Sequence, residues 1–237
     1  MANKNLLIIG ASSGIGAALA QQMVRLGNYR VFAASRRKPA FLPLPEIVYL
    51  PWDVQQPLTT EITSQLPDVL HGVVYCPGTI TLKPFHRLTP DDFRQDWDVN
   101  VMGAVTVLQS ILPKLKKAEG ASVVLFSSVA AQTGMGFHAS VAAAKAAVEG
   151  LGKALAAEWA AQKIRVNILA PSLTDTPLAG TLLATPEKRE AAARRHPLGR
   201  TGTPDEIAAL ARFLLLDEAA WITGQVIAAV GGLSTLR

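Results

Sequence analysis

Two serines and a lysine in the segment FSSVAAQTGMGFHASVAAAKAAVEG, residues 126–150, are of types suited to chemistry. Ser127 and Ser128 follow an apolar run that ends at Phe126, and Lys145 lies on the Ala-rich helical segment after them. In sheets of parallel strands, ligands bind at the carboxyl ends of the strands. The positions of Ser128 and Lys145 therefore indicate contact with a bound cofactor and its substrate.

A glycine-rich turn near the amino terminus predicts the class of that cofactor. In LLIIGASSGIGAALAQQMVRLG, three glycines lie between an apolar run and a helical pattern. Glycines allow a tight turn, and the free N–H groups and positive dipole of a helix start attract a pyrophosphate. The pattern therefore predicts a dinucleotide site. Its turn residues are Gly10, Ser12, Ser13, Gly14, Ile15 and Gly16.

The end of the second apolar run favours NADP(H) over NAD(H). There, VFAASRRK places Ser35, Arg36 and Arg37 where a carboxylate would hold a free ribose 2′-hydroxyl. A guanidinium matches a phosphate with two hydrogen bonds, although two solvated arginines at a helix start are the alternative. Asp53, in LPWDVQ, is a candidate acceptor for the adenine amine, with an ordinary turn or cap as its alternative.

Short apolar runs alternate with helical patterns along the whole chain. Nearly continuous apolar runs are typical of parallel strands that are covered on both faces. The alternation predicts an α/β fold, a single doubly wound parallel sheet of the Rossmann type with right-handed crossovers. The predicted strands are 5–10, 30–35, 46–51, 71–76, 122–127, 165–170 and 225–230, and the clearest helices are 15–26, 91–112, 137–160 and 204–216.

Length and composition indicate one well-buried domain over residues 1–237. Apolar residues make up 49% of the chain and charged residues 17%, which allows a large core. The Ala-, Arg- and Thr-rich segment 173–200, between the sixth and seventh strands, is long enough to serve as a substrate lid. Neither a linker nor a repeat divides the sequence.

Charge and cysteine content argue against several other functions. The net charge of +5 comes from scattered or paired basic residues without a long tract, so nucleic-acid binding is not expected. One cysteine, Cys76, excludes an internal disulfide, and the four histidines lack metal-ligand spacing, so no metal site is expected. The first residues do not resemble a signal peptide and no run approaches a membrane span, so we expect a cytoplasmic protein.

Taken together, these residues resemble the short-chain dehydrogenase/reductase family over essentially the whole chain. The latter half is most similar to 3-oxoacyl-carrier-protein reductases and 2,4-dienoyl-CoA reductases. The matching segments are GASSGIG (10–16), WDV (52–54), DVNVMG (98–103), VVLFSS (123–128), AAAKAAVEGLGKALAAEWA (142–160), IRVNILAPS (164–172), HPLGRTGTPDEIA (196–208) and WITGQVIAAVGG (221–232).

The resemblance implies a role for each matching position. Asn100 would bend its helix and hold a water of the proton relay, and Ser128 would donate a hydrogen bond to the substrate oxygen. Lys145 would hold the nicotinamide ribose, and Thr174 and Thr176 would contact the nicotinamide amide and the phosphates. Further cofactor contacts implied by position are Val54, Cys76, Pro77, Gly78 and Pro171.

The sequence also departs from the family pattern. The usual Tyr-x-x-x-Lys reads Val141-x-x-x-Lys145, and the Asn-Ala-Gly usual after the fourth strand is Cys76-Pro77-Gly78. Ser172 replaces the glycine usual after Pro171, and Val230 replaces an aspartate. Only the change at Val141 removes a proton donor, and losing a positioned general acid costs about 10²–10⁴ in rate.

Three interpretations of Val141 remain open from the sequence. First, His138 lies two helical turns before Lys145, the offset at which enoyl reductases of this superfamily carry their tyrosine, so its imidazole is a candidate acid. Second, reduction of a conjugated double bond leaves an enolate that hydroxyl donors stabilise. Dienoyl-CoA reductases also lack a tyrosine in the Tyr-x-x-x-Lys frame, but their own catalytic tyrosine falls at Ala130 here. Third, the protein binds NADP(H) without catalysis, as a sensor or an inactive subunit.

The interpretation we favour is an NADP(H)-dependent oxidoreductase that acts on an acyl-thioester-like or conjugated carbonyl substrate, such as an acyl-CoA or an acyl carrier protein thioester. A catalytically impaired NADP(H)-binding protein is the alternative. By the same resemblance, helices 91–112 and 137–160 would pair with their symmetry mates in a homodimer or homotetramer.

Overall fold

Seven parallel strands form one sheet in the computed structural model, which describes residues 4–236. The strand order is β3-β2-β1-β4-β5-β6-β7, so the chain reverses direction across the sheet between β1 and β4. This is the doubly wound order in which ligands bind at the switch point. The strands are β1 (Lys4–Ile9), β2 (Tyr29–Ser35), β3 (Ile47–Pro51), β4 (Gly72–Tyr75), β5 (Ala121–Phe126), β6 (Ile164–Pro171) and β7 (Val226–Ala229).

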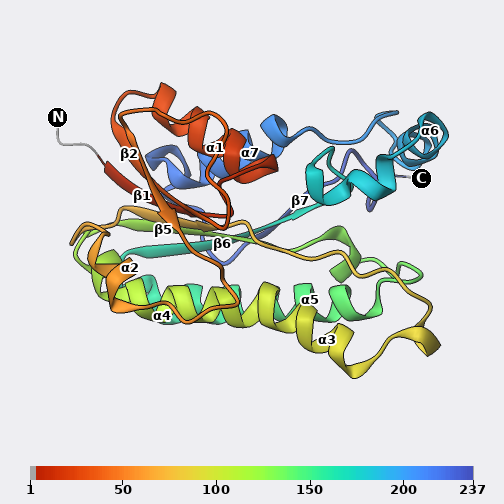
Figure 1. Ribbon diagram of the computed structural model, residues 1–237, viewed down its shortest axis with the longest axis horizontal. Coiled ribbons are helices and arrows are strands. Elements are labelled where there is room, and N and C mark those ends of the chain that lie inside the picture. The colour runs from red at the N-terminus through yellow and green to blue at the C-terminus, as the bar shows by residue number, and fades with distance from the viewer. Residues whose placement is uncertain (1–3, 237) are drawn as a thin grey trace.

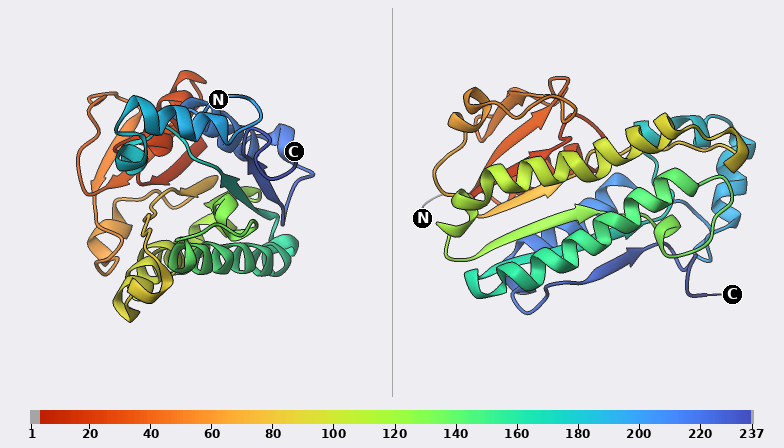
Figure 2. Two further views of the ribbon diagram at one scale, coloured as in Figure 1. Left: turned by 90° about the vertical axis from the view of Figure 1, so that its right-hand side faces the viewer. Right: turned by 90° about the horizontal axis from the view of Figure 1, so that it is seen from below.

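Helices cover both faces of this sheet (Figure 1). One face carries α1 (Gly14–Arg25) and α7 (Pro204–Leu215), and the other carries α2 (Thr60–Ser64), α3 (Pro90–Trp97), α4 (Gly103–Lys116) and α5 (Ala139–Trp159). Figure 2 shows α4 and α5 side by side beneath the strands. A further helix, α6 (Pro186–Arg194), lies beyond the carboxyl ends of β6 and β7.

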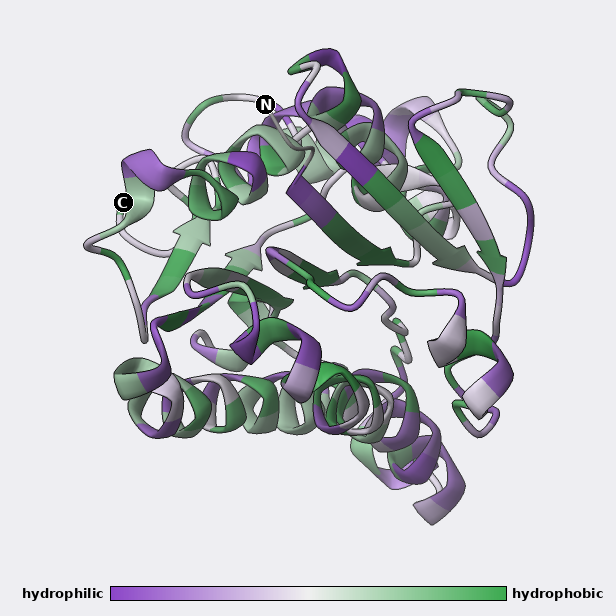
Figure 3. Cartoon of the chain, turned by 90° about the vertical axis from the view of Figure 1, so that its left-hand side faces the viewer, coloured by the Kyte–Doolittle hydropathy of each residue, from purple (hydrophilic) through white to green (hydrophobic). Residues whose placement is uncertain are grey.

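The two faces of the sheet bury separate apolar clusters. Beneath α4 and α5, the cluster includes Ile111 and Trp159, whereas α1 and α7 contribute Leu19 and Leu214 to the other. Burying a side chain of this size contributes about 1.5–3 kcal/mol. The strands are mostly green in Figure 3 because they are apolar on both faces, as predicted for parallel strands. The prediction of the fold class is confirmed.

The predicted helix over 91–112 is one continuous rod with a wider turn inside it. A π-helical turn at Asp98–Met102 joins α3 to α4, and Asn100 lies within it. Such turns often occur at functional sites. The short helix α2 and the lid helix α6 were not predicted. None of the helices within residues 4–236 is long and apolar enough to cross a membrane.

Candidate active site

Two adjoining cavities open at the carboxyl edge of the sheet. The first, of about 570 Å³, is lined by the glycine-rich turn and the ends of β2, β3 and β4. The second, of about 390 Å³, is lined by the ends of β5 and β6, the start of α5 and the lid. Both are bordered by Ile15, Cys76, Gly78 and Thr176, so they form one continuous groove. The first fits a nucleotide, and the second lies where its reactive end would meet a substrate.

The glycine-rich turn is shaped for an anion by its packing. A Cβ on Gly16 would stand 2.4 Å from the Gly10 carbonyl oxygen, so only glycine allows the turn to close. Gly10 has φ +81°, and a Cβ added to it would stand 3.2 Å from Cys76 and Pro77. Ser13 makes no side-chain cap at the start of α1, whereas threonines cap α3, α6 and α7. The N–H groups of α1 are thus available to a phosphate.

The predicted 2′-phosphate residues lie at one end of the first cavity. Arg36 and Arg37 are exposed, and neither takes part in an ion pair within residues 4–236. Ser35 is buried and its Oγ donates to the Arg37 carbonyl oxygen at 2.8 Å, which fixes the turn that carries both guanidinium groups. Asp53 lines the same cavity and accepts from the Gln55 N–H at 3.1 Å, the turn contact foreseen as its alternative role.

Lys145 is a buried ammonium in the wall of the second cavity, beside Gly78, which borders both cavities. It is 7% exposed, and its Nζ donates to the Phe126 carbonyl oxygen at 2.9 Å. Burial lowers the pKa of Lys145 to about 8, although Cys76 and Asp96 nearby act in the opposite direction. Keeping this charged amine buried near the start of α5 therefore lowers the free energy of unfolding.

The lowered pKa of Lys145 predicts how the stability of the protein depends on this residue. A pKa of about 8 in place of 10.5 corresponds to about 3 kcal/mol. Between pH 8 and pH 10.5 the unfolded chain binds one proton more than the folded protein does. Burial of the charged amine therefore lowers the free energy of unfolding by its full amount below pH 8, and this loss disappears above pH 10.5. We expect Lys145→Met to raise the free energy of unfolding at pH 7 by about 2 kcal/mol, because the lost bond to Phe126 offsets part of the gain.

Denaturant unfolding at pH 7 and pH 10 checks this expectation. The gain should shrink at the higher pH, where the wild-type amine is neutral in the folded protein and pH 10 lies close to the pKa of the unfolded chain. Lys153→Met, at an exposed position on the same helix, is the matched control and should bring no such gain. A Lys145→Met protein less stable than wild type at pH 7 would contradict the account.

Asn100 occupies the space beside Lys145. Its Nδ2 donates to the Asp96 carbonyl oxygen at 2.7 Å and to Thr79 Oγ1 at 2.8 Å, whereas its buried Oδ1 has no partner within the described residues. This Oδ1 and Lys145 Nζ each lie 3.2 Å from the point where a Cβ on Gly78 would stand. Glycine at 78 therefore keeps a polar space between the two groups open, as the implied water of a relay requires.

Asp96 and Thr79 were missed by the sequence reasoning. Asp96 is fully buried, and its Oδ1 accepts hydrogen bonds from the hydroxyls of Thr79 and, at 3.0 Å, Thr81. A buried carboxylate is costly unless it is hydrogen-bonded. These contacts tie the segment after β4 to α3 and so fix the position of Asn100. The sequence gives no sign that Asp96 positions Asn100, because Asp96 is one polar residue among several in the predicted helix 91–112.

The predicted acid–base residues meet in the second cavity. Ser128 is half-buried and accepts from the Ala130 N–H at 3.2 Å, which leaves its own hydrogen free to donate. Val141 is buried and lines the cavity together with Ser128, Lys145 and His138. His138 lies at the start of α5, where its Nδ1 meets the Gly136 carbonyl oxygen at 2.7 Å, so Nε2 is the ring nitrogen without that contact. The cavity thus holds no phenol at position 141, but it does hold an imidazole.

The predicted lid covers this cavity. Thr176 packs against the glycine-rich turn, since its Cγ2 lies 3.2 Å from the point where a Cβ on Gly14 would stand. Thr174 is buried after Pro171, and its hydroxyl donates to the Ser172 carbonyl oxygen at 3.1 Å. A 3-10 stretch, Pro177–Leu183, and α6 follow, and several of their apolar side chains line the cavity. The segment 173–200 is therefore ordered structure above the groove.

Two further reactive side chains near the groove are unsuited to chemistry. Burial raises the pKa of the Cys76 thiol to about 12, so it stays protonated near neutral pH. Tyr75 is 3% exposed and its hydroxyl donates to the Val99 carbonyl oxygen at 2.5 Å, while burial raises its pKa further. Tyr75 is therefore a packing residue and does not replace the absent phenol.

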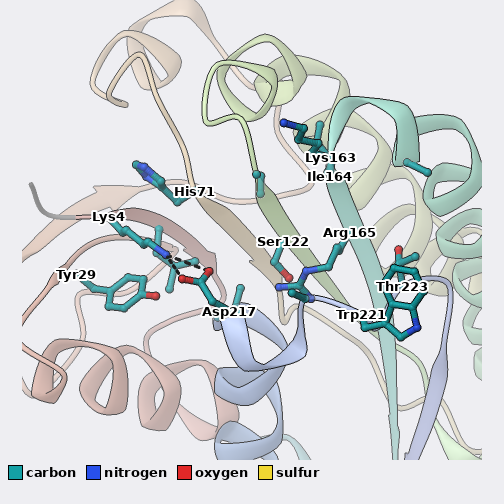
Figure 4. Close-up of a pocket in the computed structure, with 16 residues that line it drawn as sticks. Lys4, Tyr29, His71, Ser122, Lys163, Ile164, Arg165, Asp217, Trp221 and Thr223 are labelled. Atoms are coloured by element: carbon teal, nitrogen blue, oxygen red, sulfur yellow. Dashed lines mark hydrogen bonds and ion pairs between the residues drawn. The ribbon is translucent and has the colours of Figure 1, made fainter.

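A third cavity, of about 500 Å³, lies at the opposite, amino edge of the sheet (Figure 4). Two of its charged groups are already bonded: Lys4 pairs with Asp217 at 3.0 Å, and Arg165 donates to the Leu214 carbonyl oxygen at 2.8 Å. It holds no group with chemistry comparable to that of the groove. Within residues 4–236, no group of three or more His, Cys, Asp or Glu side chains could hold a metal ion.

Comparisons with known proteins agree with this geometry. A family model described as enoyl-(acyl carrier protein) reductase matches residues 10–234. The 3-oxoacyl-[acyl-carrier-protein] reductase FabG of Thermotoga maritima is 36% identical over 97% of both chains. A tropinone reductase homolog of Arabidopsis thaliana, At2g29290, is 33% identical over 97% of this chain and 92% of its own. Among solved structures, a 3-ketoacyl-(acyl-carrier-protein) reductase of Brucella melitensis, complexed with NADH, has a TM-score of 0.88 and 25% identity over 98% of this chain and 99% of its own.

Proposed function

Given that the chain belongs to the short-chain dehydrogenase/reductase family of oxidoreductases, we propose that it is an NADPH-dependent reductase of acyl-thioester-like or conjugated carbonyl compounds. One observation carries the proposal: a single groove joins the anion-binding turn and two free guanidinium groups to a cavity lined by Ser128, Lys145 and apolar lid residues. This arrangement suits a phosphorylated cofactor at one end and an apolar acyl group at the other.

The preference for NADPH rests on Arg36 and Arg37. They extend from the end of β2, and their charges are not matched by a partner in the described chain. A phosphate on the ribose would supply that partner through charge-assisted hydrogen bonds. The NADH bound to the Brucella melitensis protein shows only that a relative takes a nicotinamide dinucleotide.

The substrate class rests on the lining of the second cavity. Ile80, Phe126, Met135 and Leu182 contribute apolar surface, and Ser128 is among the polar residues that line the same cavity. Cavities of this kind place one polar group of an apolar ligand and bury the rest. The relatives named for acyl carrier protein substrates support a thioester carbonyl as that polar group.

Each polar residue has a part in the proposed reaction. When bound, NADPH would supply a hydride to an electrophilic carbon. The Ser128 hydroxyl would donate to the substrate oxygen, and the Lys145 ammonium would hold the ribose hydroxyls and stabilise the developing negative charge. Asn100 would keep a water beside Lys145. His138, which precedes the first residue of α5, is one candidate for the acid that takes the place of the absent phenol.

A non-catalytic NADP(H)-binding protein is the second candidate. Val141 favours it, because valine neither donates a proton nor stabilises charge. In either case we propose a cytoplasmic homodimer or homotetramer that pairs through the outer faces of α4 and α5. The exposed side of α5 carries a row of small residues that would allow a close helix approach, namely Ala143, Ala146, Gly150, Ala154 and Ala157.

Cofactor titration and turnover assays test this proposal together. Fluorescence titration should give a lower Kd for NADPH than for NADH. Matched 3-oxoacyl and trans-2-enoyl thioesters of several chain lengths are then followed by NADPH absorbance. Oxidation of NADPH with one of the two series would support the reductase and identify its reaction. Tight NADPH binding without turnover of any substrate would favour the binding protein instead.

A further inference from the structure

A buried histidine of the lid lies against the wall of the substrate cavity. His196 is 4% exposed and makes two hydrogen bonds through its ring. Its Nδ1 lies 2.8 Å from the Ala192 carbonyl oxygen on α6, and its Nε2 lies 2.8 Å from Ser172 Oγ. Ser172 itself lines the cavity, so the histidine reaches the substrate space only through this serine.

The partners of His196 determine how the hydrogens are arranged. A carbonyl oxygen only accepts, so Nδ1 must carry a hydrogen. In the neutral ring Nε2 then accepts, and the Ser172 hydroxyl is its donor. The lone pairs of Ser172 Oγ remain for a ligand in the cavity. A hydroxyl bonded to an imidazole that a third group orients is an arrangement by which enzymes move protons through a serine.

Both members of the pair are held firmly in place. Ser172 follows β6 directly, and its N–H donates to the carbonyl oxygen of Ala229, the last residue of β7, at 3.2 Å. The ring of His196 packs against Gly231, where an added Cβ would come within 3.6 Å of Cδ2. A pair fixed in this way loses little entropy when it engages a ligand.

Two departures from the family pattern therefore face the same cavity. Val141 removes a hydroxyl from the α5 side, and Ser172 adds one on the β6 side in place of the usual glycine. Ser128 lines the same cavity and is free to donate to the substrate oxygen. Besides His138 at the start of α5, Ser172 is a side chain of this cavity that can exchange a proton with that oxygen.

We propose that Ser172, positioned by His196, exchanges a proton with the substrate oxygen in place of the missing phenol. This inference rests on the proposed reductase function. In reduction, hydride adds to the carbonyl carbon and the C=O electron pair moves to oxygen. That oxygen takes the Ser172 proton, and Ser172 recovers one from Nε2 of the imidazolium form of His196. In alcohol oxidation the same proton passes from the substrate through Ser172 to neutral His196.

The test compares variants in two backgrounds, wild type and Val141→Tyr. Ser172→Gly restores the residue usual in the family, so its fold is not at risk. Ser172→Thr keeps the hydroxyl, His196→Gln removes the imidazole, and Ser110→Ala, an exposed serine of α4, is the control. Turnover of the best thioester and the Kd of NADPH are measured for each protein.

In the wild-type background we expect Ser172→Gly and His196→Gln each to lower kcat by about 10²-fold, the usual contribution of a proton-transfer group. The double variant should be no slower than either single one, because the two residues act as a unit. Ser172→Thr should retain most of the activity, and the Kd of NADPH should stay within threefold of wild type. In the Val141→Tyr background the loss on Ser172→Gly should be tenfold or less.

Other outcomes would overturn the inference. Equal losses in both backgrounds would make the pair purely structural. Loss of activity in His138→Gln, with Ser172→Gly unaffected, would assign the proton to His138. If the wild type is inactive and Val141→Tyr is active, then Ser172 and His196 cannot replace a phenol, although the proposed reductase function is supported. Silence of both proteins with every substrate would instead overturn the reductase function itself.

Discussion

Val141→Tyr is expected to raise kcat for reduction of a 3-oxoacyl thioester by about 10²-fold, the lower part of the range for a positioned general acid. Val141 and Lys145 are one helical turn apart on α5, and both line the substrate cavity. The new ring would extend into open space rather than into the core. The neighbouring ammonium would then lower the pKa of the phenol and make it an effective acid.

Val141→Phe is the matched control for this change, because it adds the same ring without the hydroxyl. It should leave kcat at or below the wild-type value, and single-turnover measurements with NADPH in excess would compare all three proteins. An equal gain from phenylalanine would mean that packing, not proton donation, limits the wild type. No gain from tyrosine would contradict the assignment of position 141 as the vacant acid position.

The second large effect concerns the choice of cofactor. We expect the double substitution Arg36→Ala and Arg37→Ala to raise the Kd of NADPH by about 10²-fold, with a change of threefold or less for NADH. Hydrogen bonds to charged groups contribute about 1.5–3 kcal/mol each, and 1.4 kcal/mol is a factor of ten in affinity. The loss should shrink at high salt, since both guanidinium groups are exposed.

Titration of NADPH and NADH with the variant checks this expectation. The double substitution Lys116→Ala and Lys117→Ala is the control, since it removes two exposed charges at the end of α4, away from the groove. A similar loss for NADH, or a similar effect of the control, would contradict a specific contact with the ribose phosphate.

The parts of the fold that could be predicted are those with local signals. Runs such as VVLF before Ser127 are apolar on both faces, and the glycines at 10, 14 and 16 require a particular backbone, so the strand positions and the turn could be predicted from the sequence. The predicted strands match the observed ones to within one residue at each end. Lys145 and Ser128 were recognised because the resemblance assigns them, and the structure brings both to one cavity.

The remaining features depend on contacts between distant parts of the chain. Ser172 and His196 are 24 residues apart, and nothing near either residue predicts their hydrogen bond. Asp96 lies in a helical pattern, and only the fold brings Thr79 to its carboxylate. The lid helix α6 has a weakly apolar face and buries little more than Ala192. Its sequence therefore carries little helical periodicity in hydrophobic residues.

Transfer of deuterium from NADPH, labelled at the hydride position, to a thioester product would show directly that the protein is an NADPH-dependent reductase. Wild-type protein is incubated with the labelled cofactor and both thioester series, and the products are analysed by mass spectrometry, which detects slow turnover. We expect one deuterium in the product of one series and none without protein. Tight NADPH binding with no deuterium in any product would contradict it and leave a binding protein built on a reductase fold.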